Sequence, residues 1–114
     1  MTKTVVIDGK EYRMRASALI PKLYRFRFNR DCIADLSALQ EKLRATDKPL
    51  DVMDLTIFEN IAWLMCRQAD KSIPDDPDEW LDSIDGPFSI YEALPQIMAL
   101  WQAGTATTST PAKK

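Results

Sequence analysis

The chain has 114 residues, of which 46% are hydrophobic and 28% charged, so disorder over most of its length is excluded and one folded domain is expected. The net charge of −2 does not favour a nucleic-acid-binding protein. Residues 1–30, however, carry eight basic and two acidic side chains, a local balance of +6, and the other 84 residues carry −8. We interpret this asymmetry as two solvated faces, which also suit orientation against an acidic partner.

Residues 4–14 are predicted to form a β-hairpin. Asp8 and Gly9 separate two runs of alternating apolar residues, and Asp-Gly readily adopts the positive φ angles of a type I′ turn. Period-two alternation places four apolar side chains on one face, which should cover a core supplied by helices. These side chains are Val5, Ile7, Tyr12 and Met14.

Two helices are predicted next, over residues 21–28 and 31–44. Leu19, Leu23 and Phe26 have helical spacing, and Pro21 is acceptable only in or near the first turn. Asn29 suits a left-handed residue at the end of the first helix. The apolar stripe of the second helix consists of Ile33, Leu36, Leu39 and Leu43.

A third helix is predicted over residues 54–69, capped by Asp51 or Asp54. It is hydrophobic on most sides, which is typical of a central helix in a bundle. Burial against another chain is the alternative. We favour the central position, because a small bundle needs no partner to explain it.

The remaining helices are predicted over residues 77–84 and 88–103. Asp76 as cap, Pro77 as first helical residue and Glu79 three after the cap mark the start of the former. Pro95 should bend the latter, and Gly104 should end it. Residues 105–114 are polar and low in complexity, so a disordered tail is expected.

The sequence thus predicts a mainly α fold with a short N-terminal β-hairpin, an α+β arrangement in which four to five helices form a small bundle. Residues 1–104 are expected to form a single domain. Because histidine is absent, no Ser-His or Cys-His pair and no zinc set exists. Cys32 and Cys66 are interpreted as small buried apolar residues. We expect no enzymatic activity, metal or cofactor.

Four acidic residues, Asp75, Asp76, Asp78 and Glu79, lack the ligand order of a calcium loop, so helix capping explains them better. The segment Arg25 to Arg30 interleaves basic and aromatic side chains. Such a segment can bind single-stranded nucleic acid, but we expect Phe26 and Phe28 to be buried between solvated arginines. No stretch is long enough to cross a bilayer, and no signal peptide precedes the hairpin, so we expect a cytosolic protein without a membrane partner.

Five segments carry a family resemblance through their order along the chain. They are V-x-I-D-G-K-E-Y-R, A-S-A-x-x-P-x-L-Y-R-F-R-F-N-R-D, F-E-N-I-A-W-L-M, P-D-x-P-D-E-W-L and I-Y-E-A-L-P-Q-I. Over residues 3–111 the series resembles the tail assembly chaperones of long-tailed bacteriophages and of prophages in Gram-positive bacteria. Relatives commonly have Gly where this chain has Asn29, which suits the same left-handed backbone role.

The resemblance implies a non-enzymatic protein that coats the tape measure protein until tail tube subunits polymerise around it. It implies location in the cytoplasm of the bacterial host and absence from the mature virion. A longer form, made by ribosomal frameshifting near the codons for Lys113 and Lys114, would bring in the tail tube protein. A homo-oligomer is a further possibility, and no nucleic-acid partner is expected.

A chaperone for a helical client needs apolar and aromatic helix surfaces. The candidate partner-binding residues are Tyr24, Arg25, Arg27, Phe28, Trp63 and Trp80. Two alternatives stay open. One is a small nucleic-acid-binding regulator that uses the basic N-terminal segment, and the other is a structural tail or connector subunit of the virion.

Overall fold

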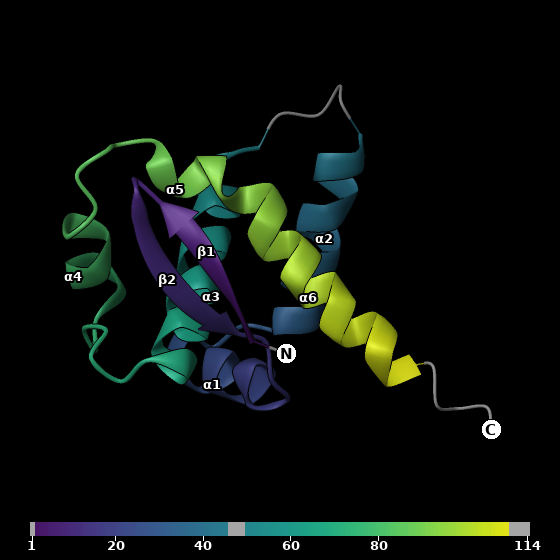
Figure 1. Ribbon diagram of the computed structural model, residues 1–114. Helices are drawn as coiled ribbons and strands as arrows, with labels where there is room; N and C mark the ends of the chain where they lie inside the picture. Colours follow the sequence, from purple (N-terminus) through teal and green to yellow (C-terminus); the bar gives the residue numbers. More distant parts are fainter. Residues whose placement is uncertain (1, 46–49, 110–114) are drawn as a thin grey trace.

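The computed structural model describes residues 2–45 and 50–109, with the backbone alone for 102–109. Within these ranges, two strands are followed by six helices, most of the chain being helical. The hairpin lies across α3 (Val52–Ala69). In Figure 1, α1 (Leu19–Phe28) lies below the hairpin, α2 (Cys32–Arg44) to its right and α4 (Pro77–Asp82) to its left. The short α5 (Ser89–Glu92) and α6 (Leu94–Ser109) pack against β1. The predicted α+β fold is confirmed.

The hairpin forms as its sequence predicts. Strands β1 (Thr2–Ile7) and β2 (Lys10–Arg15) pair antiparallel, with Ile7 opposite Lys10. Asp8 and Gly9 have φ angles of 56° and 77°, both positive as a type I′ turn requires. The four alternating apolar side chains from Val5 to Met14 are all buried, so the inner face of the hairpin forms one wall of the core.

The helix boundaries agree with prediction where a capping residue marks them. Asp51 caps α3 and forms a reciprocal capping box with Asp54, so the helix begins at Val52, two residues before the predicted start. Asp76 caps α4, Pro77 being its first residue, although the helix ends at Asp82 and not at residue 84. The 31–44 helix begins at Cys32, because Asp31 is its N-cap.

Two boundaries were predicted less well. Helix α1 begins at Leu19 and not at residue 21, since its first turn accommodates Pro21, and it ends as predicted at a left-handed Asn29. The predicted helix 88–103 is two helices, interrupted at Ala93 just before Pro95. Helix α6 then continues through Gly104 to Ser109, so residues 105–109, expected to be disordered, are helical. The rest of the expected tail, 110–114, lies outside the described residues.

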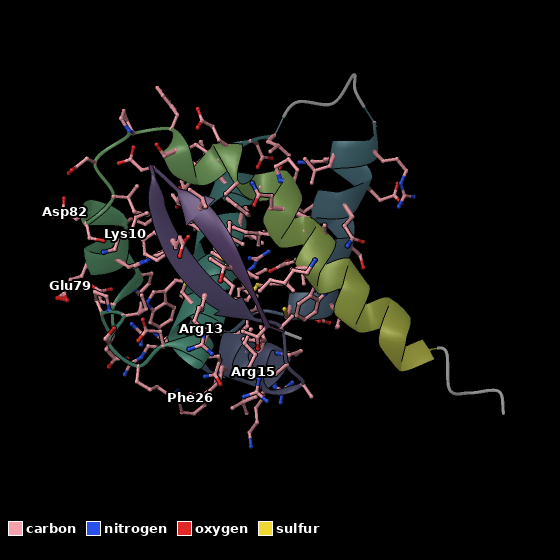
Figure 2. All side chains as sticks on the ribbon, viewed as in Figure 1. Lys10, Arg13, Arg15, Phe26, Glu79 and Asp82 are labelled. Atoms are coloured by element: carbon pink, nitrogen blue, oxygen red, sulfur yellow. The ribbon has the colours of Figure 1, made fainter. Side chains whose placement is uncertain are left out.

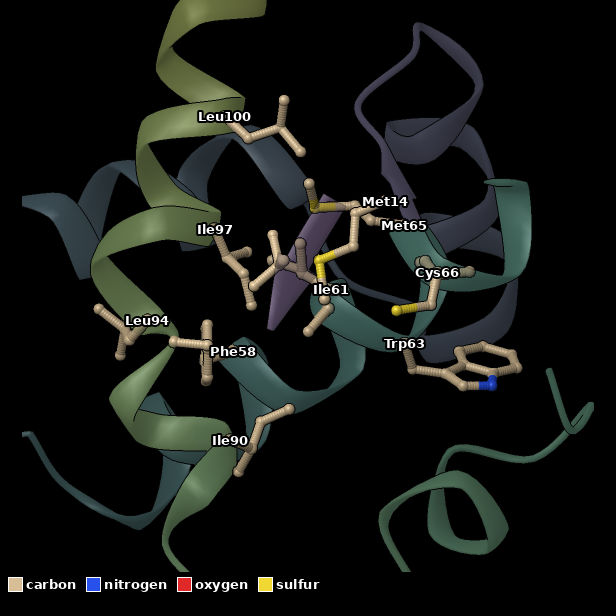
Figure 3. Close-up of a cluster of buried hydrophobic side chains, with 14 of the residues drawn as sticks. Met14, Phe58, Ile61, Trp63, Met65, Cys66, Ile90, Leu94, Ile97 and Leu100 are labelled. Carbon is tan, nitrogen blue, oxygen red and sulfur yellow. The ribbon is translucent and has the colours of Figure 1, made fainter. Parts of the chain in front are cut away.

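Helix α3 is the centre of the hydrophobic core. Six consecutive residues, 61–66, are buried, because the hairpin covers one side of α3 and helices cover the others. Met65 lies close to Met14 of β2, and Ile97 and Leu100 of α6 face them (Figure 3). The prediction that the broad apolar surface of α3 belongs to the core is therefore confirmed. Cys32 and Cys66 are buried free thiols, also as predicted.

Candidate partner-binding surface

Helix α1 presents an apolar stripe to solvent. Leu19, Leu23 and Phe26 are spaced by four and three residues, so they lie along one face of the helix. Phe26 is 88% exposed and Leu19 44% exposed, while Leu23 is partly buried at the border of the core. We call these three residues the α1 stripe. Of the three, Phe26 was predicted from sequence to be buried, and this prediction is wrong.

The core face of α1 consists instead of Ile20 and Tyr24, with Phe28 one turn further on. The Tyr24 ring packs against Phe28 at a centroid distance of 5.3 Å, and Phe28 meets Trp63 of α3 edge-on at 6.3 Å. This row of α1 faces the core. It leaves the α1 stripe outside.

A hydrogen-bonded charge network fixes this rotation of α1. The Tyr24 hydroxyl donates to Asp35 Oδ2 of α2 at 2.7 Å. Arg30 binds the same carboxylate with two donors, Nε to Oδ2 at 2.7 Å and Nη2 to Oδ1 at 3.0 Å. The Arg30 guanidinium holds the pKa of Asp35 below its usual range, and burial together with Asp35 raises the pKa of Tyr24. Asp35 therefore stays ionised although it is buried.

Basic side chains flank the α1 stripe. Lys22 and Arg25 are exposed on α1, and within the described residues neither side chain makes a hydrogen bond or an ion pair. Arg27, on the other flank, is held by its neighbours: its guanidinium lies 5.0 Å from the Trp63 ring centroid and donates to the Asp75 carbonyl at 3.3 Å. The stripe thus has two cations with no acidic partner beside it.

A surface depression lies beside Arg25. It encloses about 390 Å³ between the outer side of α1 and the start of α2, and Pro21, Asn29 and the exposed Ile33 are among its lining residues. Ile33 was predicted to lie in the buried stripe of α2, as was Leu43, which is also exposed. The buried face of α2 is instead centred on Cys32, Asp35, Leu36 and Leu39.

The opposite charge gathers at α4. Phe26, Arg13 and Arg15 lie toward the α1 end of the molecule, whereas Glu79 and Asp82 project from α4 (Figure 2). Asp76 serves as the helix cap, as predicted. Among the residues described by the structure, no cluster of three or more Cys, Asp or Glu side chains is arranged to hold a metal ion.

The six predicted partner-binding residues separate into two groups. Tyr24, Trp63 and Trp80 are at most 3% exposed and Phe28 is largely enclosed, so these aromatic side chains serve the core and cannot present a surface. Trp80 lies beneath the hairpin, edge-on to Tyr12 at 5.8 Å. Helical spacing alone does not tell a buried aromatic face from an exposed one.

The two predicted arginines, Arg25 and Arg27, are exposed as expected. Phe26, which the sequence placed between them as a buried residue, is the most exposed large apolar side chain described. Sequence reasoning missed it as a site residue, together with Leu19 and Lys22. The available signal was the alternation of Arg and Phe over residues 25–28, in which only one aromatic can face the core.

No family model, curated protein or solved structure matches the chain. None of the described helices is both long enough and apolar enough to traverse a bilayer.

Proposed function

We propose that the protein is a non-enzymatic tail assembly chaperone that binds the tape measure protein of a bacteriophage or prophage. The observation that carries the proposal is the α1 stripe, an apolar helix face turned to solvent with Phe26 88% exposed. A core-forming helix gains no stability from such a face, whereas a helical client can bury it. The order of sequence segments that resembles the tail chaperone family supplies the identity of the client.

The proposal includes the further features of that family. The chaperone acts in the cytoplasm of the bacterial host and is absent from the mature virion. A longer frameshifted form recruits the tail tube protein, and the gene is expected to contain an A-rich slippery sequence at the codons for Lys113 and Lys114. A gene without such a slippery sequence and without an overlapping downstream reading frame would remove this part of the proposal.

Co-expression with the tape measure protein of the same phage or prophage tests the function. We expect the soluble fraction of the tape measure protein to rise several-fold with the wild-type chain. The chaperone would cover apolar surface of the tape measure protein that otherwise causes aggregation. Phe26→Asp should abolish the effect. Phe88→Asp is the matched control, since Phe88 is 71% exposed and lies away from α1. No rise in soluble tape measure protein with the wild-type chain would refute the function.

One observation favours a second candidate, a nucleic-acid-binding regulator. Phe26 is exposed between Arg25 and Arg27, the combination that stacks on bases and holds phosphates. Fluorescence anisotropy with a labelled single-stranded oligonucleotide tests it. Micromolar binding that weakens steeply with salt would support the regulator, while absence of binding at low salt would exclude it.

A further inference from the structure

We propose that the α1 stripe packs against one amphipathic helix whose apolar face is bordered by Asp and Glu side chains. The inference deepens the proposed function and rests on it only for the identity of the client. It specifies the chemistry of the client segment: helical, apolar along one face and acidic at the margins of that face.

The apolar part of the surface has the dimensions of one helix contact. From Leu19 to Phe26 the helix rises about 10 Å, close to two turns. Positions i, i+4 and i+7 are those with which a helix meets another helix lengthwise. Leu19 and Leu23 are aliphatic, so two of the three stripe residues favour hydrophobic packing and offer nothing for stacking on nucleic-acid bases.

The charge around the stripe selects for acidic margins. Residues 12–30 contain six basic and no acidic side chains. Arg30 is already neutralised by Asp35, and Arg27 is held by Trp63 and the Asp75 carbonyl. Lys22 and Arg25 therefore face the incoming partner with uncompensated charge, which Asp or Glu beside its apolar face would satisfy.

A second copy of this chain is the less suitable occupant. Two α1 helices related by a two-fold axis would place Lys22 and Arg25 opposite the same cations, which is unfavourable. The acidic α4 of another copy provides charge, but Trp80 is buried and Leu81 is largely covered, so α4 offers no apolar stripe to match. An external acidic amphipathic helix satisfies both requirements.

Two designed peptides of about three heptads test the inference. They share one apolar stripe and differ only in flanking residues, which are Glu in one and Lys in the other. Isothermal titration calorimetry with the full chain should show binding of the Glu peptide at least about tenfold tighter than of the Lys peptide. The tighter binding should weaken as salt is added.

Variants of the chain localise the contact. We expect Phe26→Ala to weaken binding of the Glu peptide about tenfold or more, and Phe88→Ala, its matched control, to leave it unchanged. The pair Lys22→Glu with Arg25→Glu should reverse the preference toward the Lys peptide. Lys71→Glu changes an exposed lysine outside α1 and should leave the preference for the Glu peptide unchanged. Unfolding curves confirm that each variant is folded.

Equal binding of both peptides, no binding of either, or binding insensitive to Phe26→Ala would overturn the inference. So would concentration-dependent dimerisation lost in Phe26→Ala, because α1 would then serve a second copy. Oligonucleotide binding through Phe26 that is unchanged by Leu19→Ala would also overturn it in favour of stacking. Solubilisation of the tape measure protein without peptide discrimination would leave the proposed function intact. If the chain prefers the Glu peptide but does not solubilise the tape measure protein, the proposed chaperone function is wrong and the inference about the α1 stripe stands.

Discussion

Replacing Asp35 with Asn tests the network that orients α1. The Asp35 carboxylate accepts a hydrogen bond from Tyr24 and two from Arg30, all between 2.7 and 3.0 Å. The Asn side chain keeps one acceptor oxygen, but its NH₂ group would face the N–H groups of Arg30 or the hydroxyl of Tyr24, which are donors themselves. At least one charge-assisted hydrogen bond is therefore lost. A hydrogen bond to a charged group contributes roughly 1.5–3 kcal/mol, and we expect Asp35→Asn to lower the free energy of unfolding by about 2 kcal/mol.

Urea unfolding followed by circular dichroism measures the change. With a slope of about 1–3 kcal/mol per molar urea, the midpoint should fall by about 1 M at neutral pH. Asp82→Asn is the control, since Asp82 is exposed and should change stability by less than about 0.5 kcal/mol. A midpoint for Asp35→Asn equal to that of the control would refute the stabilising role of the hydrogen bonds that Asp35 accepts from Tyr24 and Arg30.

The pH dependence provides a second test of the same network. Arg30 lowers the pKa of Asp35 in the folded state, so the stabilisation is complete above the unfolded pKa of about 3.9. It is lost as the pH falls through the lower folded value. The difference between wild type and Asp35→Asn should therefore be constant from about pH 5 to 7 and shrink below about pH 4. A difference that persists unchanged in acid would contradict this reasoning.

Three further predictions concern packing, the turn and the thiols. Phe28→Ala should lower the free energy of unfolding in urea by about 3 kcal/mol, because it leaves a cavity. Phe26→Ala should lower it by less than about 0.5 kcal/mol, because Phe26 is exposed. Equal losses for the two variants would contradict the inward orientation of Phe28 and the outward orientation of Phe26. Gly9→Ala should lower the melting temperature by about 4–8 °C, since a φ of 77° strains a side-chain-bearing residue; an unchanged temperature would refute the turn. Burial raises the pKa of Cys32 to about 12 and that of Cys66 further, so a thiolate-specific reagent at about pH 8 should label them only after unfolding. Rapid labelling of the folded protein would contradict their burial.

Local signals in the sequence were sufficient for the elements that depend on neighbouring residues. The Asp8-Gly9 turn, the Asp76 cap with Pro77 and the left-handed Asn29 were predicted correctly, because each depends on backbone angles or hydrogen bonds within a few residues. The break before Pro95 was only partly foreseen. Proline lacks the N–H that would bond to the carbonyl four residues earlier and clashes with it, but whether the chain bends or separates into two helices depends on packing.

The α1 surface illustrates what local patterns leave undecided. Helical periodicity showed an apolar stripe at Leu19, Leu23 and Phe26, but α1 carries a second apolar row at Ile20, Tyr24 and Phe28. Local spacing is equally compatible with burial of either row. Asp35 of α2 accepts a hydrogen bond from Tyr24 in the second row, and this bond forms only once α1 and α2 are packed together.

The sequence by itself thus determined the α+β class, the hairpin, the central position of α3 and the capped helix starts, because short-range sterics and hydrogen bonding specify them. The tertiary structure alone decided which aromatic side chains are buried and that Phe26 of α1 faces solvent. Three aromatic candidates for partner binding, Tyr24, Trp63 and Trp80, became core residues, and Phe26 became the surface residue. The physical reason is that burial depends on contacts between segments far apart in the chain, such as the contact of Phe28 in α1 with Trp63 in α3.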